Sequence, residues 1–242
     1  LYQMNKLDNT PFNEYDQYML ETIGDMVTLV LEKILILQAE NALHFSLIEA
    51  LVNAIDGLNP IMAGHSQRVK EISMLIGQKL GLDKTEMQIL EYSAILHDIG
   101  YLLPESAQDT KQHPVIGAQM ITSAGILKEV KRAILHHHEH YNGSGYPEGL
   151  VRGDIPLAAR IIAVADMYDA IIRLNPEGEK TVHSNAVGEK TVHSNAVGEK
   201  TVHNNAVAKI KKATGGIFDP LVVVALEEVE GEINALISVW EQ

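Results

Sequence analysis

The most informative stretch of this sequence is Leu96-His97-Asp98-Ile99-Gly100. It places an imidazole beside a carboxylate, and only the carboxylate has two oxygens that can bridge a pair of cations. A His-Asp doublet therefore suits a two-metal site, although a doublet alone is a weak signal. Here the signal is stronger because further His-bearing and Asp-bearing segments surround the doublet, at His65, His113, His137-His138 and Asp166.

Composition limits the classes of protein to which the chain can belong. Its 242 residues are 46% hydrophobic, which is typical of a soluble globular protein that can bury a core. No run of about 18 apolar residues is present, so no membrane span is predicted, and no signal peptide is visible. The absence of cysteine excludes disulfides and thiolate metal sites and favours a cytoplasmic protein. The net charge of −13 argues against a nucleic-acid duplex as partner.

Apolar residues recur at helical spacing through most of the chain, which predicts an all-α fold. The longest periodic segment runs from about residue 13 to residue 55, and its heptad pattern is broken only at Asn41 and His44. This pattern predicts a coiled-coil helix and a homodimer formed through it. The alternative is that the helix packs on its own domain. We assign residues 1–56 to this N-terminal linker and dimerisation helix and residues 57–242 to a second domain.

Cap and turn residues divide the second domain into shorter helices. The segment Gly57-Leu58-Asn59-Pro60 ends the long helix and predicts a second one from Pro60 to about Leu80. Asp83 and Glu86 predict a capping box for the helix that ends at the doublet, with Gly100 as its stop. Further helices are predicted after His113, which we expect to be an N-cap before Pro114, from about Leu127 through His138, from Pro156, and from Pro220.

Residues 178–207 are three tandem copies of a ten-residue unit. The run Gly178–Val187 recurs unchanged at 188–197, and again at 198–207 with Asn204 in place of serine. A period of ten fits no clean helical face. We interpret the repeat as a duplication within a loop. We also interpret its histidines as loop residues rather than as a metal-binding tract; they are His183, His193 and His203.

Several segments in the same order resemble the HD-GYP family: His65-Ser66-Gln67-Arg68-Val69, His97-Asp98-Ile99-Gly100, the run from His137 to Pro147, and the run from Ala159 to Ala170. The resemblance covers residues from about 50 to about 228. It implies an HD-type helical bundle that acts as a metal-dependent phosphodiesterase on cyclic di-GMP. The residues from Phe12 to Asp16 also resemble the last helix of a GAF sensor domain, so the chain is similar to the C-terminal part of a GAF–HD-GYP protein.

The resemblance implies a centre of two divalent ions, iron or manganese, in which the carboxylate of Asp98 bridges both and serves catalysis. The ions would activate a water that opens cyclic di-GMP to linear pGpG, with GMP as the product of further cleavage. Family members with a third metal carry a carboxylate where this chain has Ile61, so we expect two ions. The implied ligands are His65, His97, Asp98, His113, His137, His138 and Asp166.

The resemblance also implies the residues around the substrate, and here the chain departs from the family. Tyr101 stands where the doublet motif usually ends in lysine, so it offers a hydrogen bond but no positive charge. The basic segment expected after Asp169 is absent, with Arg173 as a partial substitute. The loop before His113 is shorter than usual. The implied substrate-binding residues are Gly143, Gly145, Tyr146, Pro147 and Arg173.

Three functions therefore remain open at this stage. The leading hypothesis is a phosphodiesterase for cyclic di-GMP, which the complete ligand set favours. The second is a degenerate member that binds metal and the cyclic dinucleotide as a sensor without efficient turnover, which the lost basic residues favour. The third is a phosphohydrolase for another nucleotide. In the family the Gly-rich loop is linked to partner recognition, which implies a diguanylate cyclase-type partner.

Overall fold

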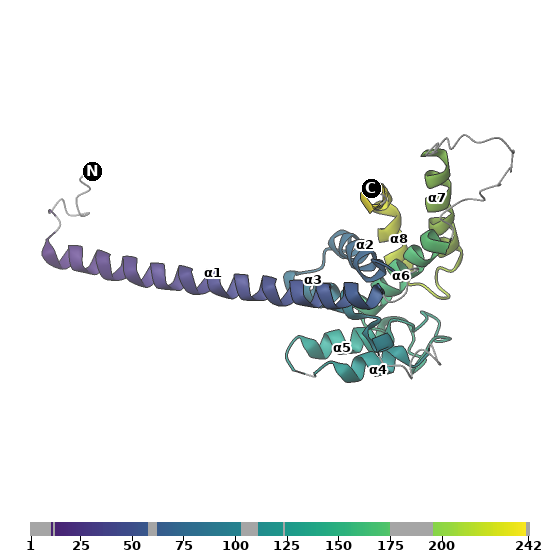
Figure 1. Ribbon diagram of the computed structural model, residues 1–242, viewed down its shortest axis with the longest axis horizontal. Coiled ribbons are helices and arrows are strands. Elements are labelled where there is room, and N and C mark those ends of the chain that lie inside the picture. The colour runs from purple at the N-terminus through teal and green to yellow at the C-terminus, as the bar shows by residue number, and fades with distance from the viewer. Residues whose placement is uncertain are drawn as a thin grey trace. The chain divides into compact units, whose positions relative to one another are not determined.

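The computed structural model describes residues 11, 13–57, 62–102, 111–122, 124–174 and 196–240. These residues form helices and connecting turns without a β-strand, so the predicted all-α fold is confirmed for them (Figure 1). None of the helices in this described part is long and apolar enough to cross a membrane. The chain divides into two compact units, Leu1–Ala50 and Leu51–Gln242.

The predicted long helix is confirmed as α1, which spans Glu14–Asp56 and is drawn in purple and blue in Figure 1. Its start is fixed by a reciprocal pair: the backbone N–H of Asn13 donates to Asp16 Oδ2 and that of Asp16 donates to Asn13 Oδ1. Within the first unit many of the described apolar side chains of this helix are exposed. Those of the predicted heptad seam are between 45% and 57% exposed at Ile23, Val27, Val30, Ile34 and Leu37.

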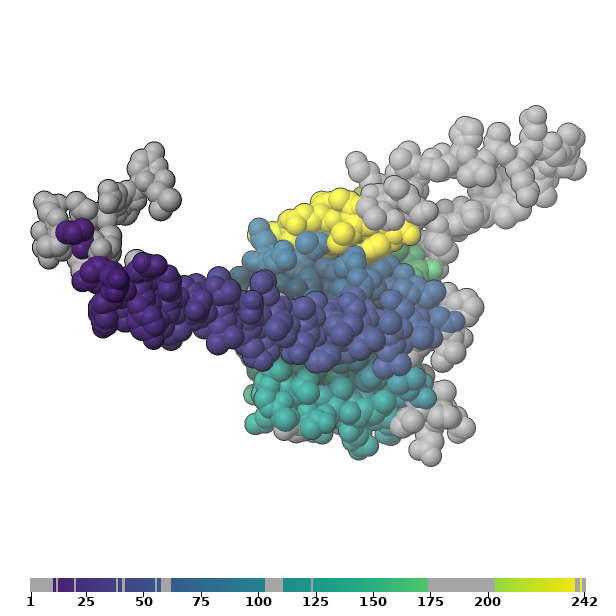
Figure 2. All heavy atoms as spheres, turned by 60° about the vertical axis from the view of Figure 1, so that its left-hand side comes forward, coloured from purple at the N-terminus to yellow at the C-terminus, as the bar shows by residue number. Residues whose placement is uncertain are grey.

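The second unit is a bundle of short helices. They are α2 (His65–Lys79), α3 (Lys84–Leu96), the 3-10 helix η1 (Ile99–Leu102), α4 (His113–Met120), α5 (Leu127–His136), the 3-10 helix η2 (Arg152–Asp154), α6 (Leu157–Leu174), α7 (Ala196–Lys212), α8 (Pro220–Glu228) and α9 (Glu230–Trp240). Helix α2 packs on α3 and α6, and α4 lies beside α5. Figure 2 shows the C-terminal helices, in yellow, against the blue surface of α2.

Helix α6 lies at the centre of this bundle, in contact with α2, α3, α5, α7 and α8. Its Ile161, Ile162 and Tyr168 are fully buried, together with Ile72 of α2 and Leu90 of α3. Removing a large apolar side chain of this kind from water contributes about 1.5–3 kcal/mol to folding. The core therefore holds α6 in a fixed position, and α6 is the helix that carries Asp166.

Several helix ends differ from the prediction by a few residues. The capping box of Asp83 and Glu86 is present as predicted. Helix α2, however, begins at His65 rather than at Pro60, after Gly64 in the left-handed region. His113 is the first residue of α4 rather than its N-cap, which is Gln112, and Pro114 is the second helical residue. Proline tolerates either place, since the first N–H groups of a helix have no intrahelical partner.

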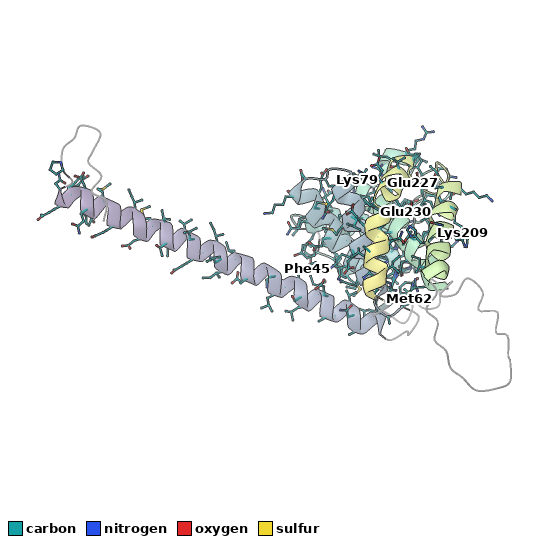
Figure 3. The ribbon with its side chains drawn as sticks, turned by 90° about the horizontal axis from the view of Figure 1, so that it is seen from above. Phe45, Met62, Lys79, Lys209, Glu227 and Glu230 are labelled. Atoms are coloured by element: carbon teal, nitrogen blue, oxygen red, sulfur yellow. The ribbon has the colours of Figure 1, made fainter. Side chains whose placement is uncertain are left out.

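The interpretation of His203 as a loop residue is wrong. The third copy of the repeat lies within α7, and its His203, Ala206 and Val207 are buried. The hydroxyl of Tyr168 contacts His203 Nδ1, and His203 Nε2 lies 2.9 Å from Oε1 of Glu230, which is labelled in Figure 3. The other repeat histidines, His183 and His193, are outside the described residues.

Candidate metal centre

The His97-Asp98 doublet lies where α3 ends. His97 is the C-cap of the helix, and its Nδ1 donates to the carbonyl oxygen of Ala94 at 2.8 Å. The chain then turns into η1, where Gly100 lies against the first turn of α4. A Cβ atom at Gly100 would stand 2.0 Å from the carbonyl oxygen of His113. Glycine is therefore required here for close approach rather than as a helix stop, and this approach brings His113 to the doublet.

The side chains that were predicted as metal ligands form two groups. The first group is His65, His97 and Asp98, and the second is His113, His137 and His138; within each, the possible ligand atoms lie within 4.8 Å of one another. Asp166 joins the first group, because its Oδ1 lies 3.5 Å from His65 Nε2. The seven side chains thus meet at one place, although they are up to about a hundred positions apart in the sequence. They come from α2, from the ends of α3 and α5, from α4 and from α6.

Asp98 stands between the two groups and faces both. Its Oδ2 lies 3.6 Å from His65 Nε2 and 3.4 Å from His97 Nε2. Its Oδ1 lies 3.2 Å from His113 Nε2 and 3.8 Å from His137 Nε2. One carboxylate oxygen therefore serves each group. This is the arrangement that a carboxylate bridging two cations requires.

The histidine rings are oriented by hydrogen bonds on their outer nitrogens. Nδ1 of His65 donates to Asp169 at 2.7 Å, and Nδ1 of His137 donates to the carbonyl oxygen of Ile134 at 2.7 Å. A neutral ring that donates through Nδ1 presents the lone pair of Nε2 as a metal ligand. His97 has the same arrangement through Ala94, so three rings direct Nε2 at the centre.

The inner nitrogens approach one another closely. The Nε2 atoms of His65 and His97 are 3.3 Å apart, and that of His113 is 3.2 Å from His137 and 3.1 Å from His138. Lone pairs that face each other at this distance repel unless a proton or a cation lies between them. The donor set of imidazoles and carboxylates is one that divalent iron, manganese and zinc accept. The residues therefore fit two divalent ions.

The charges of the centre shift the pKa values of its members in opposite directions. Burial alone would lower the pKa of His65, but its bonds to Asp169 and Asp98 and the charge of Asp166 outweigh burial and raise it to about 10. Burial would raise the pKa of Asp98, yet the surrounding histidines hold it well below its usual value. In the second group, burial and the neighbouring imidazoles lower the pKa of His137, and they lower that of His138 to about 4.

Burial also raises the pKa of Asp166, against the attraction of His65 and His97. The first group thus combines acidic side chains with a protonated His65, whereas His137 and His138 of the second group are neutral. A cation that enters the first group must displace a proton, because only the deprotonated ring can coordinate.

Asp169 supports the centre and had no role in the sequence prediction. It is 2% exposed and accepts hydrogen bonds from His65 Nδ1, from Arg68 Nε at 2.6 Å and from Arg173 Nε at 2.6 Å. The bonds from His65 and Arg68 hold the pKa of Asp169 at about 2 despite its burial. Arg173, which we expected at the substrate, is thus placed on this buried carboxylate, and its Nη1 also meets Met62 Sδ. Met62 is labelled in Figure 3.

A helix end decides which histidines of the run 136–138 reach the centre. We expected all three on successive helical positions, but α5 ends at His136 and His137 is its C-cap. The chain turns there, so His137 and His138 both face the centre. His136 instead bonds the carbonyl oxygen of Arg132 and lies 3.2 Å from Glu148.

The Gly-rich loop is anchored behind the second group. Glu139 is buried, and its carboxylate accepts the backbone N–H groups of Glu148, Gly149 and Leu150 at 2.7–3.1 Å. A Cβ atom at Gly145 would stand 2.2 Å from the backbone nitrogen of His140, so only glycine fits. The loop thereby places the Tyr146 ring on that of His138, with ring centres 5.0 Å apart.

Gly143 and Pro147 have other surroundings in the loop. Gly143 has a φ of 83° and donates to the carbonyl oxygen of His140, and Pro147 is exposed beyond Tyr146. His140 itself bonds Ser144 Oγ rather than the centre. Of the substrate-binding residues predicted in this loop, Gly145 and Tyr146 are therefore the ones that lie against His138.

Tyr101 lies directly on the second group. Its ring stacks on that of His113, with centres 4.2 Å apart and an angle of 15° between the planes. Burial, followed by the charge of Asp98, raises the pKa of its hydroxyl above the usual value. The phenol is therefore neutral at physiological pH and can donate one hydrogen bond beside His113.

The chain is similar to known proteins in sequence and in fold. The sequence model of the HD domain family matches residues 49–194, more than half of the chain. A cyclic di-GMP phosphodiesterase response regulator from Xanthomonas campestris pv. campestris is 37% identical over 147 residues, which are 54% of this chain and 39% of that protein. A 3'3'-cGAMP-specific phosphodiesterase from Vibrio cholerae is 31% identical over 156 residues, which are 57% of this chain and 34% of that protein.

A solved structure shares the fold. The crystal structure of a cyclic GMP-AMP specific phosphodiesterase from V. cholerae matches with a TM-score of 0.54 and 22% sequence identity, over 76% of this chain and 47% of that one. The aligned regions cover about two fifths or less of the length of both curated relatives. The family match and the shared fold lead to one conclusion: the chain belongs to the HD domain family, as the HD-GYP resemblance of its sequence predicted.

Proposed function

We propose that the protein is a metal-dependent phosphodiesterase that hydrolyses cyclic di-GMP to linear pGpG. The observation that carries the proposal is the position of Asp98, with one oxygen toward each group of histidines. The curated relatives support the class of substrate, since they are named as phosphodiesterases for cyclic di-GMP or 3'3'-cGAMP. Further cleavage of pGpG would give GMP.

The candidate ligands would form one site for each ion. His65, His97 and Asp166 would hold one ion, His113, His137 and His138 would hold the other, and Asp98 would bind both. Two divalent ions, for which we propose iron or manganese, lower the pKa of a bound water and stabilise the phosphate oxygens during in-line displacement. The carboxylates of Asp98 and Asp166 balance part of the metal charge.

The test is a time course with manganese-loaded protein and cyclic di-GMP, with products separated by chromatography. We expect pGpG to accumulate, and Asp98→Asn to abolish its formation. A parallel reaction with 3'3'-cGAMP shows which cyclic dinucleotide is preferred. Binding of cyclic di-GMP without any product would favour the sensor hypothesis. Neither binding nor product with either dinucleotide would contradict the proposal and favour a phosphohydrolase for another nucleotide.

We also propose that the protein is a cytoplasmic homodimer that pairs through α1. The exposed seam of Ile23, Val27, Val30, Ile34 and Leu37 supports pairing, because a row of apolar residues at heptad spacing is stable in water only when covered. Light scattering should give twice the mass of the chain, and Ile34→Asp should give a monomer. A monomeric parent at high concentration would contradict pairing. The Gly-rich loop is the surface that we propose for a diguanylate cyclase-type partner.

A further inference from the structure

A lysine lies beside the second group of histidines. Nζ of Lys111 is 5.7 Å from the centre of the Tyr146 ring, and that ring stacks on His138. In the sequence Lys111 precedes His113 by two residues, so it enters the site from the start of α4. An ammonium group is therefore placed next to a metal-binding histidine, with one aromatic ring between them.

The nearby arginines are engaged on the other side of the centre. Arg68 and Arg173 both donate to Asp169, which is 2% exposed behind His65. Their charge balances that buried carboxylate, which in turn orients His65. They are part of the support of the first group. At the second group, Tyr101 contributes a neutral hydroxyl.

The contact between Lys111 and Tyr146 is of a kind that a substrate can replace. A cation over an aromatic face is held by the weak field of the ring, whereas an ammonium bonded to a phosphate oxygen gains a charge-assisted hydrogen bond. The lysine side chain has a flexible four-carbon stem and three rotatable donors. The ammonium can therefore reach an anion that is bound beside the Tyr146 ring and His138.

We propose that Lys111 binds the phosphodiester oxygens of the substrate beside His113 and His138. This proposal deepens the proposed function and rests on it. Lys111 thereby supplies part of the positive charge that Tyr101 lacks. In the structure the ammonium lies over the Tyr146 ring, next to His138.

The experiment compares the parent with Lys111→Met, Lys111→Arg and the matched control Lys128→Met. Lys128 lies on α5, the helix that leads to His137, and its side chain is exposed. With cyclic di-GMP and manganese-loaded protein, Lys111→Met should raise KM roughly tenfold, because a charge-assisted hydrogen bond is lost. It should also make KM less dependent on salt. Lys111→Arg should restore most of the loss, and Lys128→Met should match the parent.

A second measurement separates this proposal from the proposed function. Inorganic phosphate is titrated into the manganese-loaded proteins by calorimetry, and the metal content of each is determined. If the parent hydrolyses no cyclic dinucleotide, the proposed function fails, but a roughly tenfold weaker binding of phosphate to Lys111→Met still supports the role of Lys111. Equal phosphate affinity and equal KM in Lys111→Met and the parent would overturn it. Loss of metal from Lys111→Met would also overturn the proposal, because Lys111 would then support the metal-binding histidines rather than bind the substrate.

Discussion

Replacing Asp169 with asparagine should weaken metal binding while leaving the domain folded. The carboxylate accepts hydrogen bonds from His65 Nδ1 at 2.7 Å and from the Nε atoms of Arg68 and Arg173 at 2.6 Å. Asparagine has nearly the same volume but no charge. It also carries an NH2 group, which cannot accept from any of these donors. The ring of His65 therefore loses part of what orients its Nε2 toward the metal.

The expected loss of metal affinity follows from the hydrogen bond between His65 Nδ1 and Asp169. Loss of an outer carboxylate behind a metal-binding histidine typically costs about 10–100-fold in metal affinity. This corresponds to about 1.4–2.7 kcal/mol of binding free energy. Arg68 and Arg173 are only 19% and 16% exposed, so loss of the charge that they face should also lower the free energy of unfolding. We expect that loss to be about 1–3 kcal/mol.

The assay is a calorimetric titration of metal-free protein with manganese, together with thermal unfolding. The matched control is Asp219→Asn. Asp219 is 4% exposed and pairs with Arg160, but it caps α8 and contacts no metal ligand among the described residues. Both variants should unfold at lower temperature, whereas only Asp169→Asn should lose manganese affinity. Parental affinity in Asp169→Asn, with a lower unfolding temperature like that of the control, would refute this reasoning.

Three further predictions concern Tyr101, the protonation of His65 and the tandem repeat. Tyr101→Lys places a cation beside His113. It should raise the turnover of cyclic di-GMP by up to about a hundredfold, or ~3 kcal/mol of transition-state stabilisation, at unchanged metal content. Turnover no faster than that of the parent would contradict this prediction. The pKa of His65 is raised to about 10 in the folded, metal-free domain. Its protonation therefore stabilises this domain in full at pH values below about 6.5, the ordinary pKa of histidine, and the stabilisation is lost as the pH rises through 10. Manganese affinity, measured by calorimetry, should therefore increase from pH 6.5 to 8.5. Equal affinities at the two pH values would argue against the assignment of His65 as a metal ligand. Deletion of residues 178–197 should leave the unfolding temperature within a few degrees of the parent's, because the third copy supplies the buried His203; a deletion variant that fails to melt cooperatively would show that the first two copies are needed.

Much of the architecture could be predicted from local sequence signals. The 3.6-residue period predicted α1 within one residue at each end, and Asp83 with Glu86 predicted the start of α3. These signals depend on neighbouring residues alone. A resemblance that spans the domain implied seven candidate ligands, and the structure brings their side chains together in two groups.

The remaining features depend on tertiary contacts. His203 has two sequence copies with nearly the same neighbours, so the sequence did not indicate its packing against Tyr168. The end of α5 at His136 allows His137 and His138 to face one centre, and no cap residue in the sequence marks it.

Two supporting residues could have been found from helical spacing. Asp169 follows Asp166 by three residues on α6, and Arg68 follows His65 by three residues on α2. Residues three or four apart share a helix face. Asp169 therefore shares a helix face with Asp166, and Arg68 shares one with His65. A carboxylate and a cation in these positions indicate an ion pair between the two helices beside the candidate ligands. For Lys111 the sequence offers only its position before His113, and its role depends on the stacking of Tyr146.

The most direct test of the two-metal centre is the number of manganese ions bound per chain in the parent and in Asp98→Ala. The proteins are loaded anaerobically under reducing conditions, separated from free metal and measured by elemental analysis. Because each oxygen of Asp98 faces one group of histidines, we expect two ions in the parent and loss of both in the variant. One ion or none in the parent, or two ions retained in Asp98→Ala, would contradict a centre bridged by Asp98.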